Sequence, residues 1–198
     1  MSIDILIAGV GGQGTVLASR LLAAAAIDEG YFVRTSETIG MAQRGGCVVS
    51  HIRIDSKEAS PVIPWGKADI LIGFEPSEAA RNIYRLSEEG SCIVNTKEIK
   101  PVTASLGTVS YDIDAVNKYI SANSKKAVFI DGYSLAQKAG SVKALNIVLL
   151  GATAAESLLP FGKSSIEKAI KDNVNPKFMD MNIKAFNYGF DYIKSICK

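Results

Sequence analysis

The residues best suited to binding a charged ligand form a glycine-rich turn near the amino terminus. An apolar run and a helical pattern enclose the sequence Gly9-Val10-Gly11-Gly12-Gln13-Gly14-Thr15. Glycines permit positive φ angles and let a ligand approach the backbone closely. The helix that follows presents unpaired N–H groups and the positive end of its dipole. The turn therefore predicts an anion site, typically for a phosphate, with candidate residues Gly9, Gly11, Gly12, Gln13, Gly14 and Thr15.

The G-x-G-x-x-G spacing of this turn leaves three interpretations open. It can bind a phosphate or a nucleotide-like ligand, it can be a tight turn that binds nothing, or it can contact another protein directly. A dinucleotide site also requires an acidic residue roughly 20 positions further on. Glu37 is the nearest candidate and lies somewhat late.

A second polar segment lies between two predicted strands. It reads Glu37-Thr38-Ile39-Gly40-Met41-Ala42-Gln43-Arg44-Gly45-Gly46 and lacks helical or strand periodicity. Arg44 suits a phosphate or a carboxylate because its guanidinium can bind two oxygens at once. The alternative is a surface loop whose arginine is held by Glu37. The candidate ligand-binding or subunit-contact residues here are Glu37, Met41, Gln43, Arg44, Gly45 and Gly46.

Alternating strand and helix patterns predict the elements that position these two segments. Apolar runs and period-two alternation predict strands over residues 3–8, 31–36, 47–54, 68–74, 91–95, 109–111 and 127–130. Helical periodicity predicts helices over residues 13–29, 76–86, 142–156 and 164–172. A last helix carries an apolar stripe of Ile183, Phe186, Phe190 and Ile193.

These elements predict an α/β fold, and we expect residues 1–198 to form one domain. The expected architecture has three layers, with a largely parallel or mixed sheet flanked by helices and a helical C-terminal part. In such a sheet, loops at the carboxyl ends of the strands meet at the ligand crevice. Residues 9–14 and 40–46 should therefore share one rim. A structure that placed them at opposite ends would remove the shared site.

Composition argues against several classes of partner. The 198 residues include 22 basic and 20 acidic side chains, with no basic run, so we expect no nucleic-acid partner. We also expect no signal peptide, and the apolar stretch over residues 16–27 is too short to span a membrane. Three isolated cysteines favour reduced thiols in the cytoplasm over a disulfide framework or a metal site.

A few further side chains have both a structural and a functional interpretation. His51 has no paired carboxylate or nucleophile, so a packed or interface histidine is favoured over a general base. Trp65 suits an interface anchor or a loop plug equally well. Asn146 lies in an apolar helix and is expected to bond a loop backbone. Ser164 and Glu167 have the spacing of a capping box.

Several motifs together resemble the gamma-type domain of 2-oxoacid:ferredoxin oxidoreductases. They are the glycine turn, the segment Ser36-Glu-Thr-x-Gly-Met-Ala-Gln-Arg-Gly-Gly46, and Ser50-His-Ile-Arg53. The resemblance covers essentially the whole chain, and the Gly-Met-Ala-Gln-Arg-Gly-Gly form is similar to the indolepyruvate branch. Further matches are Gly66-Lys-Ala-Asp69, Phe74-Glu-Pro-x-Glu-Ala79, Asn146-Ile-Val-Leu-Leu-Gly151 and Asn182-x-x-Ala-Phe186.

The resemblance implies an oxygen-sensitive, cytoplasmic enzyme of anaerobic metabolism. Such enzymes oxidatively decarboxylate a 2-oxoacid, here an aryl pyruvate such as indolepyruvate, to an acyl-CoA and pass the electrons to ferredoxin. Coenzyme A is the co-substrate. Thiamine diphosphate, Mg and [4Fe-4S] clusters would lie on a large partner subunit, so the isolated chain would be inactive.

The cysteine count and the motifs of this chain are consistent with cofactors that lie on the partner subunit. A [4Fe-4S] relay needs sets of four cysteine thiolates, and this chain has three isolated cysteines. It also lacks the Gly-Asp-Gly plus Asn pattern that holds a metal-bound diphosphate, so no cofactor is expected on this chain alone. Two alternatives stay open: a stand-alone dinucleotide-binding oxidoreductase that uses the glycine turn, and a non-catalytic assembly subunit.

Overall fold

A computed structural model describes residues 2–39, 45–55, 59–99 and 111–196. Its centre is a mixed six-stranded sheet in the order β2-β3-β1-β4-β5-β6. Strand β3 runs antiparallel to β1 and β2. The strands β1, β4, β5 and β6 run parallel to one another. The strands are β1 (Ile3–Val10), β2 (Val33–Ile39), β3 (Cys47–Ile54), β4 (Ala68–Gly73), β5 (Leu86–Asn95) and β6 (Lys126–Ile130).

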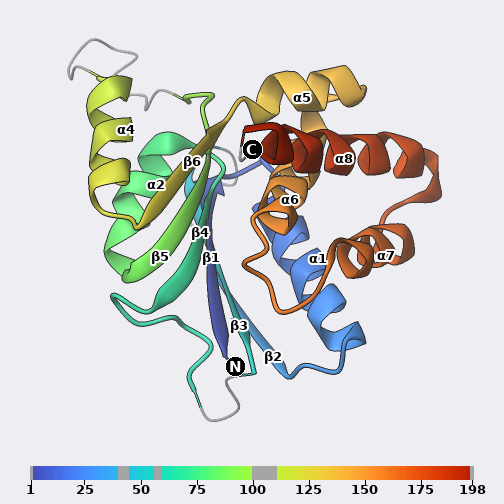
Figure 1. Ribbon diagram of the computed structural model, residues 1–198, viewed down its shortest axis with the longest axis horizontal. Helices are drawn as coiled ribbons and strands as arrows, with labels where there is room; N and C mark the ends of the chain where they lie inside the picture. Colours follow the sequence, from blue (N-terminus) through green and yellow to red (C-terminus); the bar gives the residue numbers. More distant parts are fainter. Residues whose placement is uncertain (1, 40–44, 56–58, 100–110, 197–198) are drawn as a thin grey trace.

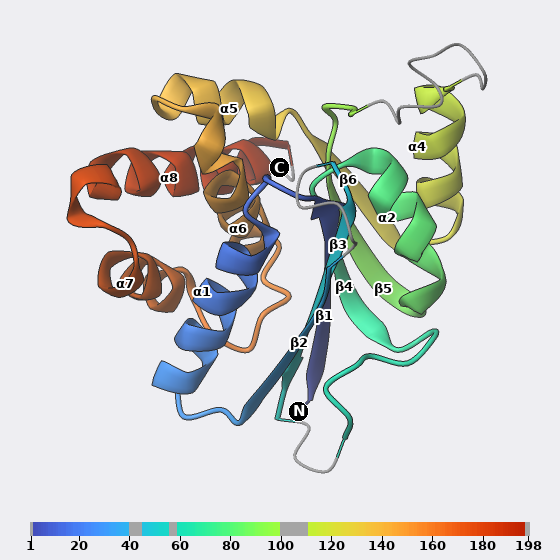
Figure 2. The same cartoon turned by 180° about the vertical axis from the view of Figure 1, so that it is seen from behind.

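Helices cover both faces of the sheet, which confirms the predicted three layers (Figures 1 and 2). One face carries α2 (Pro76–Asn82), which continues as the 3-10 turn η1 (Ile83–Arg85), and α4 (Ile113–Ala122). The opposite face carries α1 (Thr15–Asp28), α5 (Gly132–Ala139), η2 (Val142–Ala144), α6 (Leu145–Ala155), α7 (Lys163–Asn173), η3 (Pro176–Phe178) and α8 (Met179–Ile196). No helix within the described ranges combines the length and apolar character needed to cross a membrane.

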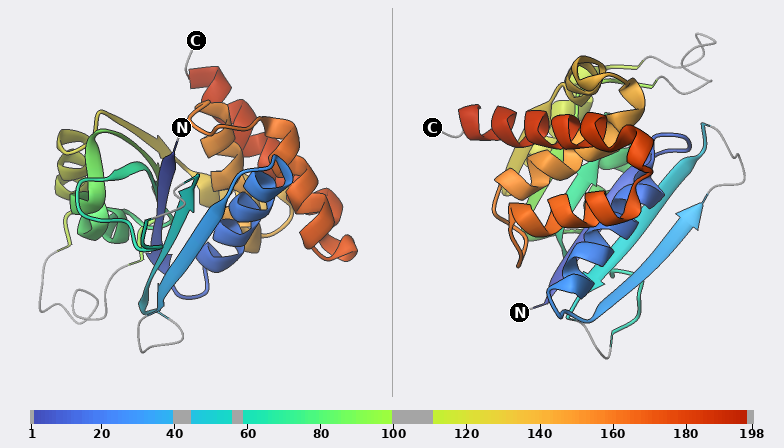
Figure 3. Two further views of the ribbon diagram at one scale, coloured as in Figure 1. Left: turned by 90° about the horizontal axis from the view of Figure 1, so that it is seen from below. Right: turned by 90° about the vertical axis from the view of Figure 1, so that its right-hand side faces the viewer.

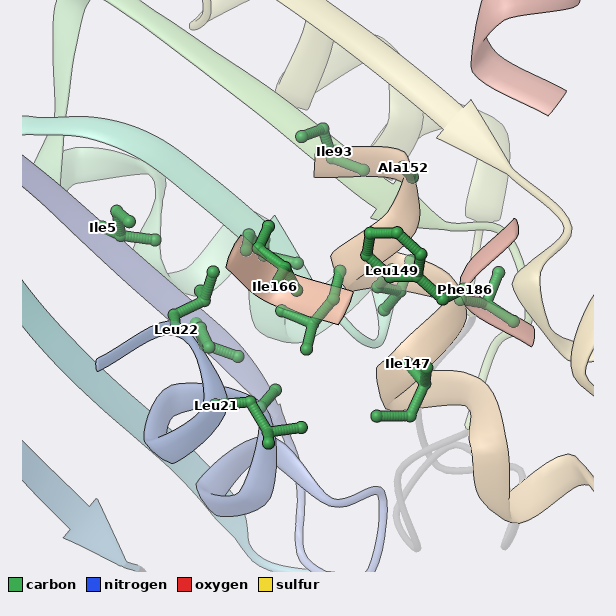
Figure 4. Close-up of a cluster of buried hydrophobic side chains, with 14 of the residues drawn as sticks. Ile5, Leu21, Leu22, Ile93, Ile147, Leu149, Ala152, Ile166 and Phe186 are labelled. Atoms are coloured by element: carbon green, nitrogen blue, oxygen red, sulfur yellow. The ribbon is translucent and has the colours of Figure 1, made fainter. Parts of the chain in front are cut away.

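The alternation of side chains along β1 separates two hydrophobic cores. Ile5 and Ile7 face the larger core under α1, α6 and α8, part of which is drawn in Figure 4. Leu6 and Ala8 face the smaller core under α2 and α4. A strand that is covered on both faces must be apolar along its whole length. This explains the apolar run from Ile5 onward in β1; the one charged residue, Asp4, is paired with Arg53.

Helices α6 and α8 pack so closely that two glycines are required between them (Figure 3). A Cβ atom on Gly151 would lie 2.0 Å from the carbonyl oxygen of Phe186. A Cβ atom on Gly189 would lie 2.0 Å from the carbonyl oxygen of Val148. The sequence segments 146–151 and 182–186, recognised separately as motifs, therefore belong to one helix–helix contact.

Several predicted boundaries were wrong. Helix α1 begins at Thr15, not at residue 13, and β2 extends to Ile39, so the start of the second polar segment is strand. The helix after Pro76 ends as a 3-10 turn, and β5 already begins at Leu86. Of the predicted strand over residues 109–111, only Tyr111 is described, and it has no regular structure.

The predicted capping box at the start of α7 is also wrong. The helix begins at Lys163 after Gly162, and no side chain caps its amino terminus. Ser164 already lies inside the first turn, so its hydroxyl is not in the N-cap position. Glu167 instead faces Lys163 one turn earlier, at 3.6 Å. The i,i+4 spacing of those two charges competes with the capping-box geometry.

Candidate functional site

The glycine turn joins β1 to α1, as predicted. At two of its glycines, neighbouring atoms leave no room for a side chain. Gly14 is the N-cap of α1 with φ 83°, a left-handed conformation that favours glycine. A Cβ atom on Gly14 would also lie 2.8 Å from Nδ2 of Asn146. A Cβ atom on Gly9 would lie 2.8 Å from the Cβ atom of Phe74. The turn is therefore packed tightly against the ends of β4 and α6.

The two predicted segments meet at one rim of the sheet. The Gly11 N–H donates a 2.8 Å hydrogen bond to the carbonyl oxygen of Gly46. Glu37, at the end of β2, accepts a 3.2 Å hydrogen bond from the Ser19 hydroxyl of α1. Gly45 is exposed and follows residues 40–44. Met41, Gln43 and Arg44 lie outside the described residues, so their roles remain predictions.

This rim contains the topological switch point of the sheet. Strands β1 and β4 are parallel neighbours, yet α1 covers one face and α2 covers the other (Figure 1). Connections that leave in opposite directions open a crevice at the carboxyl ends of the two strands. The glycine turn follows β1, and Glu75 caps α2 directly after β4. The position is thus the one at which α/β sheets commonly bind ligands.

Two side-chain amides span this crevice. Gln13 donates from Nε2 to the Phe74 carbonyl oxygen at 3.0 Å, and its Oε1 accepts from the Val10 N–H at 2.7 Å. Asn95, which is fully buried, donates from Nδ2 to the same Phe74 oxygen at 3.1 Å. Its Oδ1 accepts from the Gly132 N–H at 3.1 Å. The Phe74 carbonyl group thus links the ends of β1, β4 and β5, and Asn95 Oδ1 extends the link to Gly132, which follows β6.

A cavity of about 210 Å³ lies beside these amides. Gly12, Gln13 and Asn95 contribute to its wall, together with Lys97, Tyr133 and Lys143. The Lys97 ammonium lies 5.8 Å from the centroid of the Tyr133 ring. Within the described part of the chain, neither lysine forms an ion pair with a carboxylate. Two cations beside a glycine turn make the cavity suitable for an anion with an apolar or aromatic portion.

A second cavity, of about 480 Å³, lies on the other side of Asn146. Its wall includes Leu17, Lys143, Asn146, Phe178 and Asn182. Asn146 donates a 3.4 Å hydrogen bond to the Gly14 carbonyl oxygen. This confirms that Asn146 bonds a loop backbone, namely that of the glycine turn. Leu17 of α1 is 38% exposed and lines this cavity.

Two carboxylates lie at the start of α2, close to this rim. Glu75 accepts from the Glu78 N–H at 2.9 Å, as the N-cap of α2, and from the Tyr111 hydroxyl at 3.1 Å. Burial raises the pKa of Tyr111 to about 12, and it also raises the pKa of the Glu78 carboxyl group.

His51 is a packed histidine, as the sequence indicated. Its ring is buried, and Nδ1 accepts a 3.2 Å hydrogen bond from the Ile63 N–H. Burial, followed by the positive charges of Arg85 and Arg53, lowers the pKa of His51 to about 4. The imidazole is therefore neutral at physiological pH. It holds the segment before β4 against the sheet, where Trp65 is 74% exposed.

The ranges that the structure describes contain no candidate metal site. No group of three or more His, Cys, Asp or Glu side chains is arranged there to hold a metal ion. Cys47 is exposed and Cys92 is buried, in different parts of the sheet. Burial raises the pKa of Cys92 to about 12, which keeps its thiol protonated.

Sequence reasoning missed four residues of this site. Asn95 and Lys97 follow the apolar run of β5, and polar residues at the carboxyl end of a parallel strand are a usable signal. Tyr133 and Lys143 carry no such signal. They reach the cavity only because α5 and η2 pack above the end of β5. Sequence spacing does not reveal that packing.

Comparison with known proteins places this chain in a family. The model of the pyruvate ferredoxin/flavodoxin oxidoreductase family matches residues 4–192. Indolepyruvate oxidoreductase subunit IorB of Archaeoglobus fulgidus is 38% identical over 192 residues, covering 96% of this chain and 95% of that protein. The common gamma subunit of the pyruvate/ketoisovalerate oxidoreductases of Pyrococcus abyssi is 30% identical, covering 96% of each chain.

A solved structure shows the same fold. The gamma subunit of a keto/oxoacid ferredoxin oxidoreductase from Geobacter sulfurreducens superposes with a TM-score of 0.71 at 26% identity. The alignment covers 98% of this chain and 99% of that one. The resemblance inferred from the motifs is thereby confirmed: the chain belongs to the pyruvate ferredoxin/flavodoxin oxidoreductase family, among its small, gamma-type subunits.

Proposed function

We propose that this chain is the small subunit of a ferredoxin-dependent indolepyruvate oxidoreductase and forms part of its coenzyme A site. The main support for the proposal is the hydrogen bond that the Gly11 N–H donates to the Gly46 carbonyl oxygen. It joins the glycine turn to the segment that contains Arg44, at the rim where Lys97 and Lys143 border a cavity. Residues 1–198 would act there as one gamma-type domain.

Coenzyme A has the chemistry that this rim favours. Its phosphates suit the turn, the two lysines and Arg44, because backbone N–H groups and cations bind phosphate oxygens directly. Its adenine and pantetheine portions suit the apolar and aromatic wall formed by Tyr133, Val142 and Leu145. The substrate class follows from the relatives named indolepyruvate oxidoreductase subunits.

The remaining chemistry would belong to a larger partner subunit. Thiamine diphosphate with Mg would decarboxylate the aryl pyruvate, and [4Fe-4S] clusters would carry the electrons to ferredoxin. We place the complex in the cytoplasm, where reduced thiols such as Cys47 persist. In this arrangement the chain contributes binding and orientation of coenzyme A, and catalysis takes place in the partner.

The first prediction tests Arg44. The chain is coexpressed with the large subunit, and indolepyruvate-dependent dye reduction is measured at varied coenzyme A concentrations. Arg44→Ala should raise the KM for coenzyme A about tenfold, since one charge-assisted contact to phosphate is lost. Arg20→Ala, on the exposed side of α1, is the matched control and should leave the KM unchanged. An unchanged KM in Arg44→Ala would remove this residue from the site.

A further inference from the structure

The amides of Gln13 and Asn95 do more than line the cavity. The amide nitrogen of each side chain donates and its oxygen accepts, and Asn95 Nδ2 also contacts the Lys97 carbonyl oxygen at 3.5 Å. Neither amide can therefore be turned without facing oxygen against oxygen. Both donors meet on the Phe74 carbonyl oxygen, at 3.0 and 3.1 Å. We refer to Gln13, Phe74 and Asn95 as the amide bridge.

The amide bridge supports the glycine turn directly. A Cβ atom on Gly9 would lie 2.8 Å from Phe74 and 2.9 Å from the Gln13 Oε1, so the turn rests on the bridge without free space. Gln13 also closes the turn on itself, because its backbone N–H donates to the Val10 carbonyl oxygen at 3.1 Å. A displacement of the bridge must therefore displace the turn.

The bridge also connects the turn to the cationic side of the cavity. Asn95 precedes Lys97 by two residues and bonds the backbone of Gly132, which is followed by Tyr133. The turn, the lysine and the aromatic ring are thus fixed relative to one another by two buried amides. Such preorganisation lowers the cost of binding, because the groups need not be ordered when the ligand arrives.

We propose that Gln13 and Asn95 are positioning residues that hold the glycine turn in its ligand-ready shape. This inference rests on the proposed function only for the identity of the ligand. The positioning itself concerns the turn in the free chain. It can therefore be tested with and without coenzyme A, and the two tests can fail separately.

The first measurement uses the full-length chain alone. Gln13→Glu and Asn95→Asp keep the side-chain shape but replace the donating amide nitrogen with a carboxyl oxygen that faces the Phe74 carbonyl oxygen. Amide hydrogen exchange at Gly11, whose N–H bonds Gly46, should accelerate about tenfold in both variants. Asn82→Asp is the control, since Asn82 is also buried and its amide donates to the Glu78 carbonyl oxygen, away from the amide bridge. Exchange at Gly11 that matches this control would overturn the proposal.

An uncharged variant separates loss of the hydrogen bonds from the effect of an added charge, and it is less disruptive to folding. Gln13→Met removes both hydrogen bonds of the side chain without adding a charge, at a half-buried position. It should accelerate exchange at Gly11 by a similar factor. Normal exchange in Gln13→Met would show that the acidic variants act by charge alone, and the positioning role would be withdrawn.

The second measurement uses the complex with its large subunit. If the turn binds coenzyme A, Gln13→Met should raise the KM for coenzyme A about tenfold while kcat changes less than about twofold. A change in kcat at constant KM would contradict positioning of a binding element. Faster exchange at Gly11 with an unaltered KM would uphold the positioning role and overturn the proposed coenzyme A site.

Discussion

At the scale of single residues, the polar groups of this rim chiefly hold backbone in place. Gln13, Asn95 and Asn146 all bond main-chain groups of the turn or of the strand ends. Glu75 caps a helix. Polar side chains used in this way are suited to shaping a site. This agrees with the role of a small subunit that binds and orients a co-substrate.

His51 gives a residue-scale prediction about pH. Because its folded-state pKa is about 4 against an ordinary 6.5, the unfolded chain binds more protons between these values. The histidine therefore opposes folding as the pH falls from about 6.5 toward 4, by up to about 3 kcal/mol. His51→Asn keeps an acceptor for the Ile63 N–H but does not titrate. Urea unfolding at several pH values should show that wild type gains stability relative to His51→Asn as the pH rises from about 4 to 6.5, by up to about 3 kcal/mol, and that the difference is constant above about pH 7.

The carboxylates of the chain are present in both proteins, so their titration cancels in that difference. The chain has a single histidine, which makes the comparison direct. A gap that does not vary with pH would contradict the buried, neutral state of His51.

At the scale of elements, the contact between α6 and α8 stabilises the helical layer. Gly151→Ala should lower the free energy of unfolding on the order of 3 kcal/mol, because the new methyl group would meet the Phe186 carbonyl oxygen at 2.0 Å. Gly162→Ala is the matched control, since its nearest neighbour would be the Ser164 hydroxyl at 4.0 Å. Denaturant melts of the two variants measure the difference, and equal stabilities would refute the close approach of the helices.

Element boundaries show how far local patterns reach. The strand Cys47–Ile54 was predicted with its observed limits, because period-two alternation and a glycine pair mark it in the sequence. Helix α1 begins later than predicted, since Gly14 adopts a left-handed conformation against Asn146 from a distant helix. Helices α4 and α5 were not predicted individually. α4 has a single buried residue, Ile120, so the local pattern was weak.

At the scale of the whole molecule, the strand order around the rim distinguishes the proposed small subunit from a stand-alone dinucleotide-binding enzyme. A stand-alone dinucleotide-binding enzyme carries its ribose-binding carboxylate at the end of the parallel strand next to β1, whereas Glu37 lies on β2, which the antiparallel strand β3 separates from β1. We therefore expect the isolated chain to bind NAD or NADP no more tightly than about 100 μM, or roughly 5.5 kcal/mol. Isothermal titration of the purified chain measures this, and a tighter constant would favour the oxidoreductase alternative.

The sequence by itself determined the family, the α/β class and the two glycine-bearing segments, because motif residues and apolar periodicity are local properties of the chain. Only the tertiary structure decided that Asn95, Lys97, Tyr133 and Lys143 join the glycine turn. These residues come from β5, α5 and η2, and their meeting depends on the strand order and on which face each helix covers. Such relations arise from packing the two cores on either side of β1, and no spacing along the chain encodes them directly.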